Sequence, residues 1–192
     1  DDALSRRILG NSIYEVGELD RYLIDEGRST AANGPFSGLA HRELDARIWY
    51  PMVEGQAVAP GRHPLLIFGH GFSSGKASGA FFARFLARQG YIVAAVDFPL
   101  SQVGAPGGAS AADLMNQPGD VSFLIDTLLG WSQQPASAFH GRIDKGRIGY
   151  IGVSLGGLTG AHLLFDPELR DQRIRFGIAV AAPLAGLDER WL

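Results

Sequence analysis

The sequence contains no cysteine, which excludes disulfide bonds, thiol catalysis and cysteine-ligated zinc sites. It also lacks long apolar runs: stretches such as YIVAAV at 91–96 fall well short of the roughly 20 residues that a membrane-spanning helix needs. Neither sign of charge dominates, because 17 basic and 20 acidic residues leave a net charge of −3, and no run rich in Lys or Arg occurs. We therefore expect neither a membrane span nor a nucleic-acid partner. No group of His and Asp has the spacing of metal ligands, so the sequence implies no metal and no organic cofactor.

What the sequence does contain is a set of short, continuously apolar runs that end in Gly, Asp or Pro. Strands that are buried on both faces of a parallel sheet have this pattern. Two further candidate strands, 21–25 and 43–51, fit an edge hairpin or meander, and the second is expected to end at Pro51, which cannot donate to a strand ladder. The buried strands are predicted at 63–72, 90–99, 146–152 and 174–183.

Helical patterns lie between these runs. The segment 79–90 is predicted to form a helix capped by Gly90, and 119–131 a second helix with Asp120 as its N-cap. A third helix, 154–166, has glycines that allow a close approach to the sheet. The residues expected to face the sheet are Phe81, Phe82, Phe85 and Leu86 in the first helix and Val121, Leu124, Ile125, Leu128 and Leu129 in the second. The order of elements predicts one domain spanning all 192 residues, with an α/β fold: a mostly parallel sheet with helices on both faces.

The stretch RIGYIGVSLGG, residues 147–157, contains a G-x-S-x-G pattern centred on Ser154. Because the chain has 26 glycines, chance could supply such a match, and its context must decide. Here the pattern follows an apolar strand and opens a helix, which is the place of a nucleophilic serine on a tight strand-to-helix turn. Such a turn requires small residues at positions 152 and 156, and it puts the hydroxyl beside free helix amides, so that the Leu155 N–H can stabilise an oxyanion. The alternative is an ordinary glycine-rich turn with a buried serine.

A second oxyanion donor is predicted in GHGFSSG, residues 69–75, directly after an apolar strand. Gly71 permits a backbone conformation that aims the next amide inward, so the Phe72 N–H is the candidate donor, and its ring is expected to line an acyl pocket. The alternative is that this segment is only a turn. Further candidates, which would contribute to substrate access, are Tyr91, Trp131 and the glycine-rich loop 101–112.

Nearly the whole chain resembles the α/β-hydrolase superfamily. The segments that carry the resemblance are IWYP (48–51), HPLLIFGHGF (63–72), GYIVAAVDFP (90–99), DVSFLIDTLL (120–129) and DKGRIGYIGVSLGG (144–157). Within the superfamily the chain is similar to dienelactone-hydrolase-like and platelet-activating-factor-acetylhydrolase-like serine esterases, near bacterial cutinases and polyester hydrolases. Val153 stands where many relatives carry His, and serine in place of Cys or Asp argues against dienelactone hydrolase and haloalkane dehalogenase activity. The segment 21–36 looks like the N-terminal strand and turn of secreted members, which implies a secreted or periplasmic location.

The partners of a catalytic triad are harder to find in this sequence. In this fold they follow the nucleophile in the order acid, then His, and the only histidine after Ser154 is His162, about 12 Å further along the same helix. His70 is a candidate general base, but in relatives the residue at this position shapes the oxyanion loop. Asp188 lies where a few relatives place the acid, whereas most place it after a following strand. His41, His63 and His140 are expected to be solvated. Asp97 is expected to anchor a loop, and Asp144 to cap the turn before the nucleophile strand.

The chain ends at Leu192, before that following strand begins. We therefore expect the N-terminal part of a larger hydrolase, with a sheet that is incomplete at its C-terminal edge and open to pairing. The prediction is a serine carboxylester hydrolase that acts on short acyl esters, phospholipids or polyesters through an acyl-enzyme on Ser154. Its acid and His are supplied from outside this chain, by a second polypeptide segment. The competing hypothesis is a non-catalytic α/β-hydrolase-like module for binding or assembly, and amide hydrolysis stays open as well.

Overall fold

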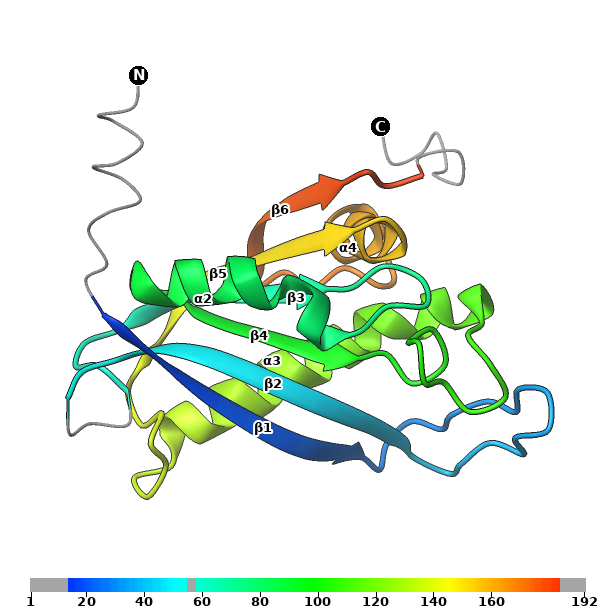
Figure 1. The fold of residues 1–192 in the computed structure, drawn as a ribbon, viewed down its shortest axis with the longest axis horizontal. Helices are drawn as coiled ribbons and strands as arrows, with labels where there is room; N and C mark the ends of the chain where they lie inside the picture. The colour runs from blue at the N-terminus through cyan, green and yellow to red at the C-terminus, as the bar shows by residue number, and fades with distance from the viewer. Residues whose placement is uncertain (1–13, 55–57, 184–192) are drawn as a thin grey trace.

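The computed structural model describes residues 14–54 and 58–183, and these form a six-stranded sheet in the order β1-β2-β4-β3-β5-β6 (Figure 1). The strands are β1 (Glu15–Asp25), β2 (Arg42–Met52), β3 (His63–Gly69), β4 (Ile92–Asp97), β5 (Ile143–Val153) and β6 (Ile174–Val180). β1 and β2 pair antiparallel, as do β2 and β4, whereas β4, β3, β5 and β6 are parallel to one another. The predicted α/β fold with a mostly parallel sheet and an antiparallel edge hairpin is therefore confirmed.

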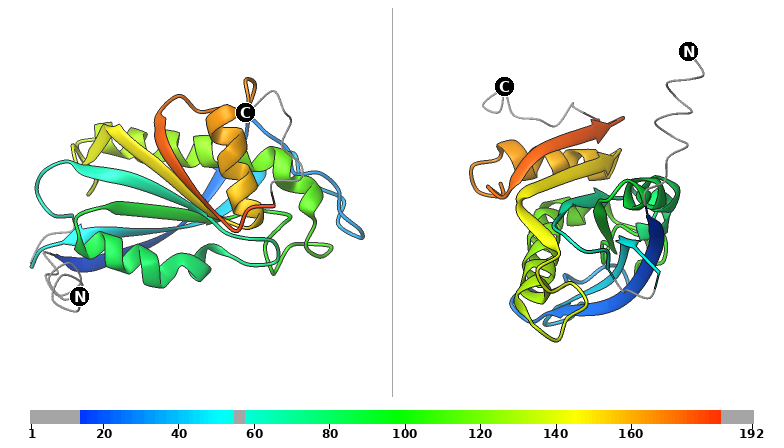
Figure 2. Two further views of the ribbon diagram at one scale, coloured as in Figure 1. Left: turned by 90° about the horizontal axis from the view of Figure 1, so that it is seen from above. Right: turned by 90° about the vertical axis from the view of Figure 1, so that its left-hand side faces the viewer.

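Helices cover both faces of this sheet (Figure 2). They are the 3-10 helices η1 (Lys76–Gly79) and η2 (Ala111–Asn116) and the α-helices α2 (Ala80–Arg88), α3 (Gln117–Gln133) and α4 (Leu155–Phe165). Successive side chains of a strand point to opposite faces, and in β3 Leu65 and Ile67 join the core beneath α3 and α4, while Leu66 and Phe68 join the core beneath α2. In the part of the chain that the structure describes, no helix is long and apolar enough to cross a membrane.

Helix α2 packs on the sheet through small residues rather than through its phenylalanines. Ala83 and Ala87 are buried, whereas Phe81, two residues before Ala83 and so on the far side of the helix, is 89% exposed. Phe82 and Leu86 flank the contact and are partly buried. The prediction that Phe81 faces the sheet was therefore wrong. The face that packs on the strands is the one with the alanines, whose short side chains bring the helix axis close to the sheet.

Helix α3 buries the predicted apolar face but begins earlier than its sequence pattern indicates. Val121, Leu124 and Leu128 are fully buried. The helix starts at Gln117, so Asp120 lies in its first turn and is not the N-cap. The carboxylate of Asp120 is instead buried in ion pairs, described below, which corrects the prediction of a capping role.

Strand β2 also corrects a prediction, because it continues through Pro51 to Met52. Proline is tolerated there because β2 pairs with β4 only from Asp45 to Trp49, so that beyond Trp49 it pairs with β1 alone. The Pro51 carbonyl accepts a hydrogen bond from the Ala59 N–H at 2.8 Å.

Candidate active site

Ser154 lies on a sharp turn between the end of β5 and the start of α4. Its backbone is strained, with φ 53° and ψ −116°, a conformation that residues other than glycine rarely adopt. The turn is held by the backbone: the Ser154 N–H donates to the Val180 carbonyl at 2.8 Å, and the Ser154 carbonyl accepts from the Gly157 N–H at 2.8 Å. Leu155 is the first residue of α4, so its amide has no acceptor within the helix. This geometry presents a half-buried hydroxyl beside a helix N-terminus.

Two glycines allow the turn to pack tightly. A Cβ on Gly152 would lie 2.0 Å from the Gly156 carbonyl oxygen, and a Cβ on Gly156 would lie 2.3 Å from the carbonyl oxygen of Gly69. Neither contact is sterically possible, so both positions exclude any larger residue. The requirement for small residues at 152 and 156 therefore follows from the close approach of the turn to itself and to β3.

The segment 69–75 lies directly against this turn. A Cβ on Gly71 would lie 3.4 Å from the Cβ of Ser154, so the loop backbone borders the serine. The next residue, Phe72, has a ring that is 47% exposed. Ser73 has φ 52°, and its N–H donates to the Ser101 carbonyl at 2.8 Å, which ties the loop to the segment after β4. The structure thus brings both candidate oxyanion segments to the same serine.

Asp97, at the end of β4, anchors the far end of this loop. Its carboxylate accepts hydrogen bonds from the backbone N–H of Lys76 at 2.6 Å and from the Lys76 Nζ at 2.8 Å. Nζ also pairs with Asp45 at 2.6 Å. These contacts fix the loop at the carboxyl end of the parallel strands, where ligands bind in open α/β sheets.

His70 is buried inside the loop and has both ring nitrogens engaged. Nε2 accepts the Phe98 N–H at 3.0 Å, so Nδ1 carries the proton and donates to the Gly71 carbonyl at 2.7 Å. Burial lowers the pKa of this imidazole and keeps it neutral. In this arrangement His70 holds the loop and has no free nitrogen to accept a proton from Ser154.

The contacts described for the other histidines also do not involve Ser154. His162 is buried in α4 with its Nδ1 3.0 Å from an Asp166 oxygen. His63 is buried, against the prediction of a solvated residue, because its nitrogens contact the Gly90 and Ala59 carbonyls at 2.9 and 3.0 Å. His41 contacts Glu43 at 3.1 Å, and His140 is exposed. None of the hydrogen bonds among the described residues joins a histidine to Ser154.

The acidic candidates are likewise separate from the serine. Asp144 is the second residue of β5, where it accepts the Gly146 N–H at 3.0 Å and pairs with Arg147 at 2.6 Å. Asp97 anchors the loop as described above. Asp188 lies outside the described residues.

Two residues proposed to line the access to the site lie at the wrong end of the molecule. Tyr91 immediately precedes β4, so the length of that strand, roughly 20 Å, separates it from the edge that carries Ser154. Trp131 lies near the end of α3 beside Phe139, with ring centroids 5.9 Å apart, about 20 Å from the helix start. The loop 101–112, by contrast, borders the site through Ser101.

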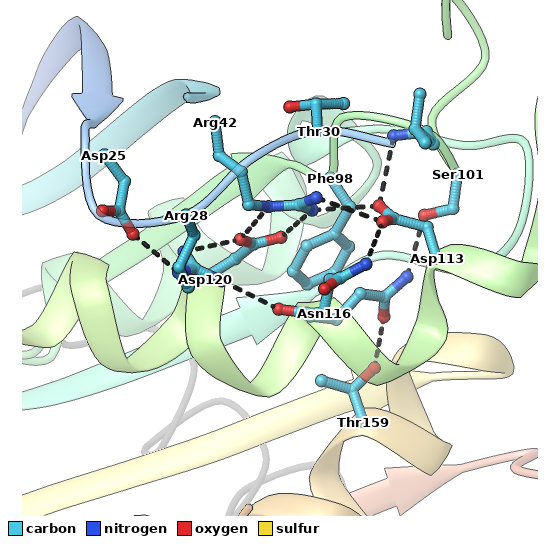
Figure 3. A network of polar contacts seen from close by, with 12 residues as sticks. Asp25, Arg28, Thr30, Arg42, Phe98, Ser101, Asp113, Asn116, Asp120 and Thr159 are labelled. Carbon is cyan, nitrogen blue, oxygen red and sulfur yellow. Dashed lines mark hydrogen bonds and ion pairs between the residues drawn. The ribbon is translucent and has the colours of Figure 1, made fainter. Parts of the chain in front are cut away.

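A buried polar cluster beside the site has no signature in the sequence. Arg42 is fully buried, and its guanidinium contacts both Asp120 oxygens at 2.7 Å and the two Asp113 oxygens at 3.0 and 3.2 Å (Figure 3). Arg28 adds a second cation 2.8 Å from Asp120. Burial acts to lower the pKa of Arg42, but the hydrogen bonds to Asp120 and Asp113 outweigh it and raise that pKa. Because its members come from distant parts of the chain, no local pattern predicts this cluster.

An apolar hollow opens on the α2 side of the sheet, next to the nucleophile turn. Its volume is about 550 Å³. The hydrophobic residues that line it are Phe68, Phe82, Ile151, Val153, Ile178 and Val180. Val153, Ile178 and Val180 are each more than a third exposed, and Phe176 continues the apolar surface along β6.

Comparison with known proteins gives no matching family model and no significant match among curated sequences. Among solved structures, the chain is similar to a ferulic acid esterase from Streptomyces cinnamoneus, with 22% identity and a TM-score of 0.63 over 84% of this chain and 57% of that one. It is also similar to a hypothetical protein from Pseudomonas aeruginosa, with 18% identity and a TM-score of 0.58 over 88% of this chain and 43% of that one. The chain thus spans about half the length of these neighbours. At this level of identity the likeness concerns the fold, and it identifies the sheet and its helices as an α/β-hydrolase fold.

Proposed function

We propose that the chain is the nucleophile-bearing part of a serine carboxylester hydrolase. The observation that carries this proposal is the strained backbone of Ser154 at the start of α4, with the loop of Gly71 against it. Strain of this kind persists only where the surrounding structure enforces it, and it clusters at functional sites. An ordinary strand-to-helix turn has no need of it.

In the proposed reaction, the Ser154 Oγ attacks the carbonyl carbon of an ester while its proton passes to a histidine. The amides of Phe72 and Leu155 donate to the oxyanion of the tetrahedral intermediate. Collapse of the intermediate expels the alcohol, which takes the proton, and leaves an acyl group on Ser154. Water then attacks the acyl-enzyme with the same histidine as base, which releases the acid and restores the serine. The proposed substrates are short acyl esters, phospholipids or polyesters, and the similarity to a ferulic acid esterase adds aromatic acyl esters to this range.

We further propose that the histidine and its acid come from a companion segment that does not belong to residues 1–192. Support comes from the histidines of this chain, whose described contacts lie away from Ser154, and from the apolar surface of β6. Phe176, Ile178 and Val180 each remain nearly half exposed on this strand, and exposed apolar patches at a sheet edge are typical of surfaces that pair with another segment.

The test is ester hydrolysis by the chain alone and with its companion. Residues 1–192 alone are expected to hydrolyse p-nitrophenyl acetate only negligibly, because oxyanion donors without a base leave residual catalysis. Everything that copurifies with the chain is identified by intact mass and sequencing, and a polypeptide with a downstream Asp and His is added back. Activity should then appear and be lost in Ser154→Ala. Full activity of the chain alone, abolished by Ser154→Ala, would contradict the need for a companion.

A fluorophosphonate probe separates the enzyme from the alternative of a non-catalytic module. That alternative is favoured by the engaged state of both nitrogens of His70. Covalent labelling of the complete assembly at Ser154, absent in Ser154→Ala, supports the enzyme. An unlabelled Ser154 in a normally folded assembly supports the module.

A further inference from the structure

Gln117, the first residue of α3, is a fully buried side-chain amide between two other buried polar residues. Its Nε2 donates to the Ser101 hydroxyl at 2.8 Å, and its Oε1 accepts a hydrogen bond from the Thr159 hydroxyl. All three side chains are fully buried. Ser101 and Thr159 are labelled in Figure 3, where they come from the loop after β4 and from α4. Gln117 therefore bridges two segments that are far apart in the sequence.

Each end of this bridge leads to one of the candidate oxyanion donors. On one side, the carbonyl of Ser101 accepts the N–H of Ser73, the residue directly after Phe72. On the other side, the Thr159 hydroxyl also lies 3.3 Å from the carbonyl of Leu155, one helical turn earlier. The bridge thus runs from the loop that carries one donor to the helix that carries the other.

Each end of the bridge also leads to a strained residue of the site. Ser73 has φ 52° and Ser154 has φ 53°, so both lie in the left-handed region that disfavours residues with a side chain. Such conformations require support from their surroundings. A primary amide suits this task because it donates at one atom and accepts at another, whereas an apolar residue of the same length leaves both hydroxyls without their partner.

We propose that Gln117 is a positioning residue that fixes the Phe72 amide relative to the Leu155 amide, so that both can donate to one oxyanion. This inference rests on the proposed function of Ser154. Gln117 itself touches neither the serine nor a substrate. It acts by holding the 69–75 loop and helix α4 at one separation.

The first test measures hydrogen exchange of the chain with and without the bridge. In Gln117→Met, amide exchange in 70–75 and 154–159 is expected to rise at least about tenfold, while exchange in β1 and β2 stays unchanged. The triple variant Gln117→Met, Ser101→Ala, Thr159→Val also removes the two buried hydroxyls that have lost their Gln117 partner, so its thermal stability should recover. Its exchange in the two segments should nevertheless stay fast. The control is Gln133→Met, an exposed glutamine at the end of the same helix.

The second test uses the assembly with its companion segment and p-nitrophenyl acetate as the probe. Loss of one oxyanion donor reduces turnover by about 10²–10³, so displacement of a donor in the triple variant is expected to lower kcat by about tenfold to a hundredfold. KM should change less than about twofold, because ground-state binding does not use the oxyanion donors. A merely structural role predicts that kcat recovers together with stability.

The outcomes separate this inference from the proposed function. An absence of fluorophosphonate labelling at Ser154 in the wild-type assembly overturns the proposed function, and with it the catalytic role of the bridge. Labelling of the wild type together with unchanged exchange in 70–75 and 154–159 overturns the positioning role alone. Normal kcat in the stable triple variant also overturns it.

Discussion

The two edge strands of the sheet, β1 and β6, differ in the side chains that they expose to solvent. β1 presents charges that are paired across its neighbours: Asp20 contacts Arg47 at 2.6 and 2.8 Å, and Glu18 contacts Arg84 at 2.6 Å. β6 carries one charged residue, Arg175, and otherwise exposes apolar side chains. Charged edges resist pairing with another strand, whereas flat apolar edges invite it.

This difference indicates which side of the molecule is complete by itself. Next to β1, both faces of strand β2 are covered, by α2 and α3, and Arg42 joins β2 to α3 through a buried charge cluster. On the β6 side, α4 covers one face, and the other face forms the wall of the apolar hollow. Ser154 lies between the two sides. The nucleophile turn, whose Ser154 N–H donates to the Val180 carbonyl of β6, therefore borders the exposed side, on which the proposed companion joins.

The largest expected effect is on the complete side. Arg42→Met leaves Asp113 and Asp120 buried without their main cation, which costs about 3–5 kcal/mol of unfolding free energy. Urea denaturation measures this loss. The matched control is Arg47→Met, which removes an arginine from a partly exposed ion pair and should cost less than about 1 kcal/mol. Equal losses in the two variants would contradict the claim that the buried cluster holds β2 to α3.

The next effect concerns the apolar edge. Ile178 is 49% exposed, so Ile178→Lys should leave the stability of the lone chain nearly unchanged. It should weaken binding of the companion segment about tenfold, because burial of the exposed half of this isoleucine side chain contributes about 1–1.5 kcal/mol. Titration calorimetry with the companion measures the affinity.

Its matched control is Ile24→Lys on β1, where the isoleucine is 45% exposed. This control should leave companion binding unchanged. A similar loss in both variants would mean that general charge, and not the β6 surface, governs the association.

The sheet and the nucleophile turn could be predicted because their signals are local. Continuous apolar runs mark the parallel strands, and G-x-S-x-G between a strand and a helix marks the turn of Ser154. The segment before the turn and the loop at 69–75 follow apolar strands whose carboxyl ends meet at one sheet edge. Their proximity therefore follows from topology alone.

The buried polar contacts could not be predicted because their partners are distant in the chain. Gln117 bonds to residues 16 and 42 positions away, and Arg42 to residues 71 and 78 positions away. The mistaken role of Asp120 has the same origin, since its partner on β2 is invisible to a local pattern. Phe81 was misplaced because helical periodicity does not distinguish a face packed through alanines from one packed through phenylalanines.

A third prediction concerns the covered centre of the sheet, where buried His70 should make the stability depend on pH in a way that the edges do not. Burial lowers the pKa of His70 below its usual value near 6.5, although the Asp97 charge opposes this. Well above pH 6.5 the imidazole is neutral in both states and contributes no pH dependence. As the pH falls below 6.5, the unfolded chain binds a proton before the native one does, so stability decreases by up to about 1.4 kcal/mol per pH unit.

The variant His70→Gln keeps an acceptor for the Phe98 N–H and removes the titration. Denaturation curves at pH 7.5, 6.5 and 5.5 should show the wild type losing more stability than this variant on acidification. If the stability of both proteins falls equally with pH, the pKa of His70 is not lowered in the folded state.

The smallest effect is expected at the charged edge itself. Hydrogen bonds from Arg47 lower the pKa of Asp20, so the stability from this pair is present above the ordinary aspartate pKa near 3.9 and is lost as the pH falls further. Because Asp20 is more than half exposed, Asp20→Asn should change the unfolding free energy by no more than about 0.5 kcal/mol. The charges of β1 then serve chiefly against strand pairing. The double variant Asp20→Asn, Glu18→Gln should therefore self-associate in sedimentation while keeping its stability, whereas a monomeric double variant would show that the charges do not protect this edge.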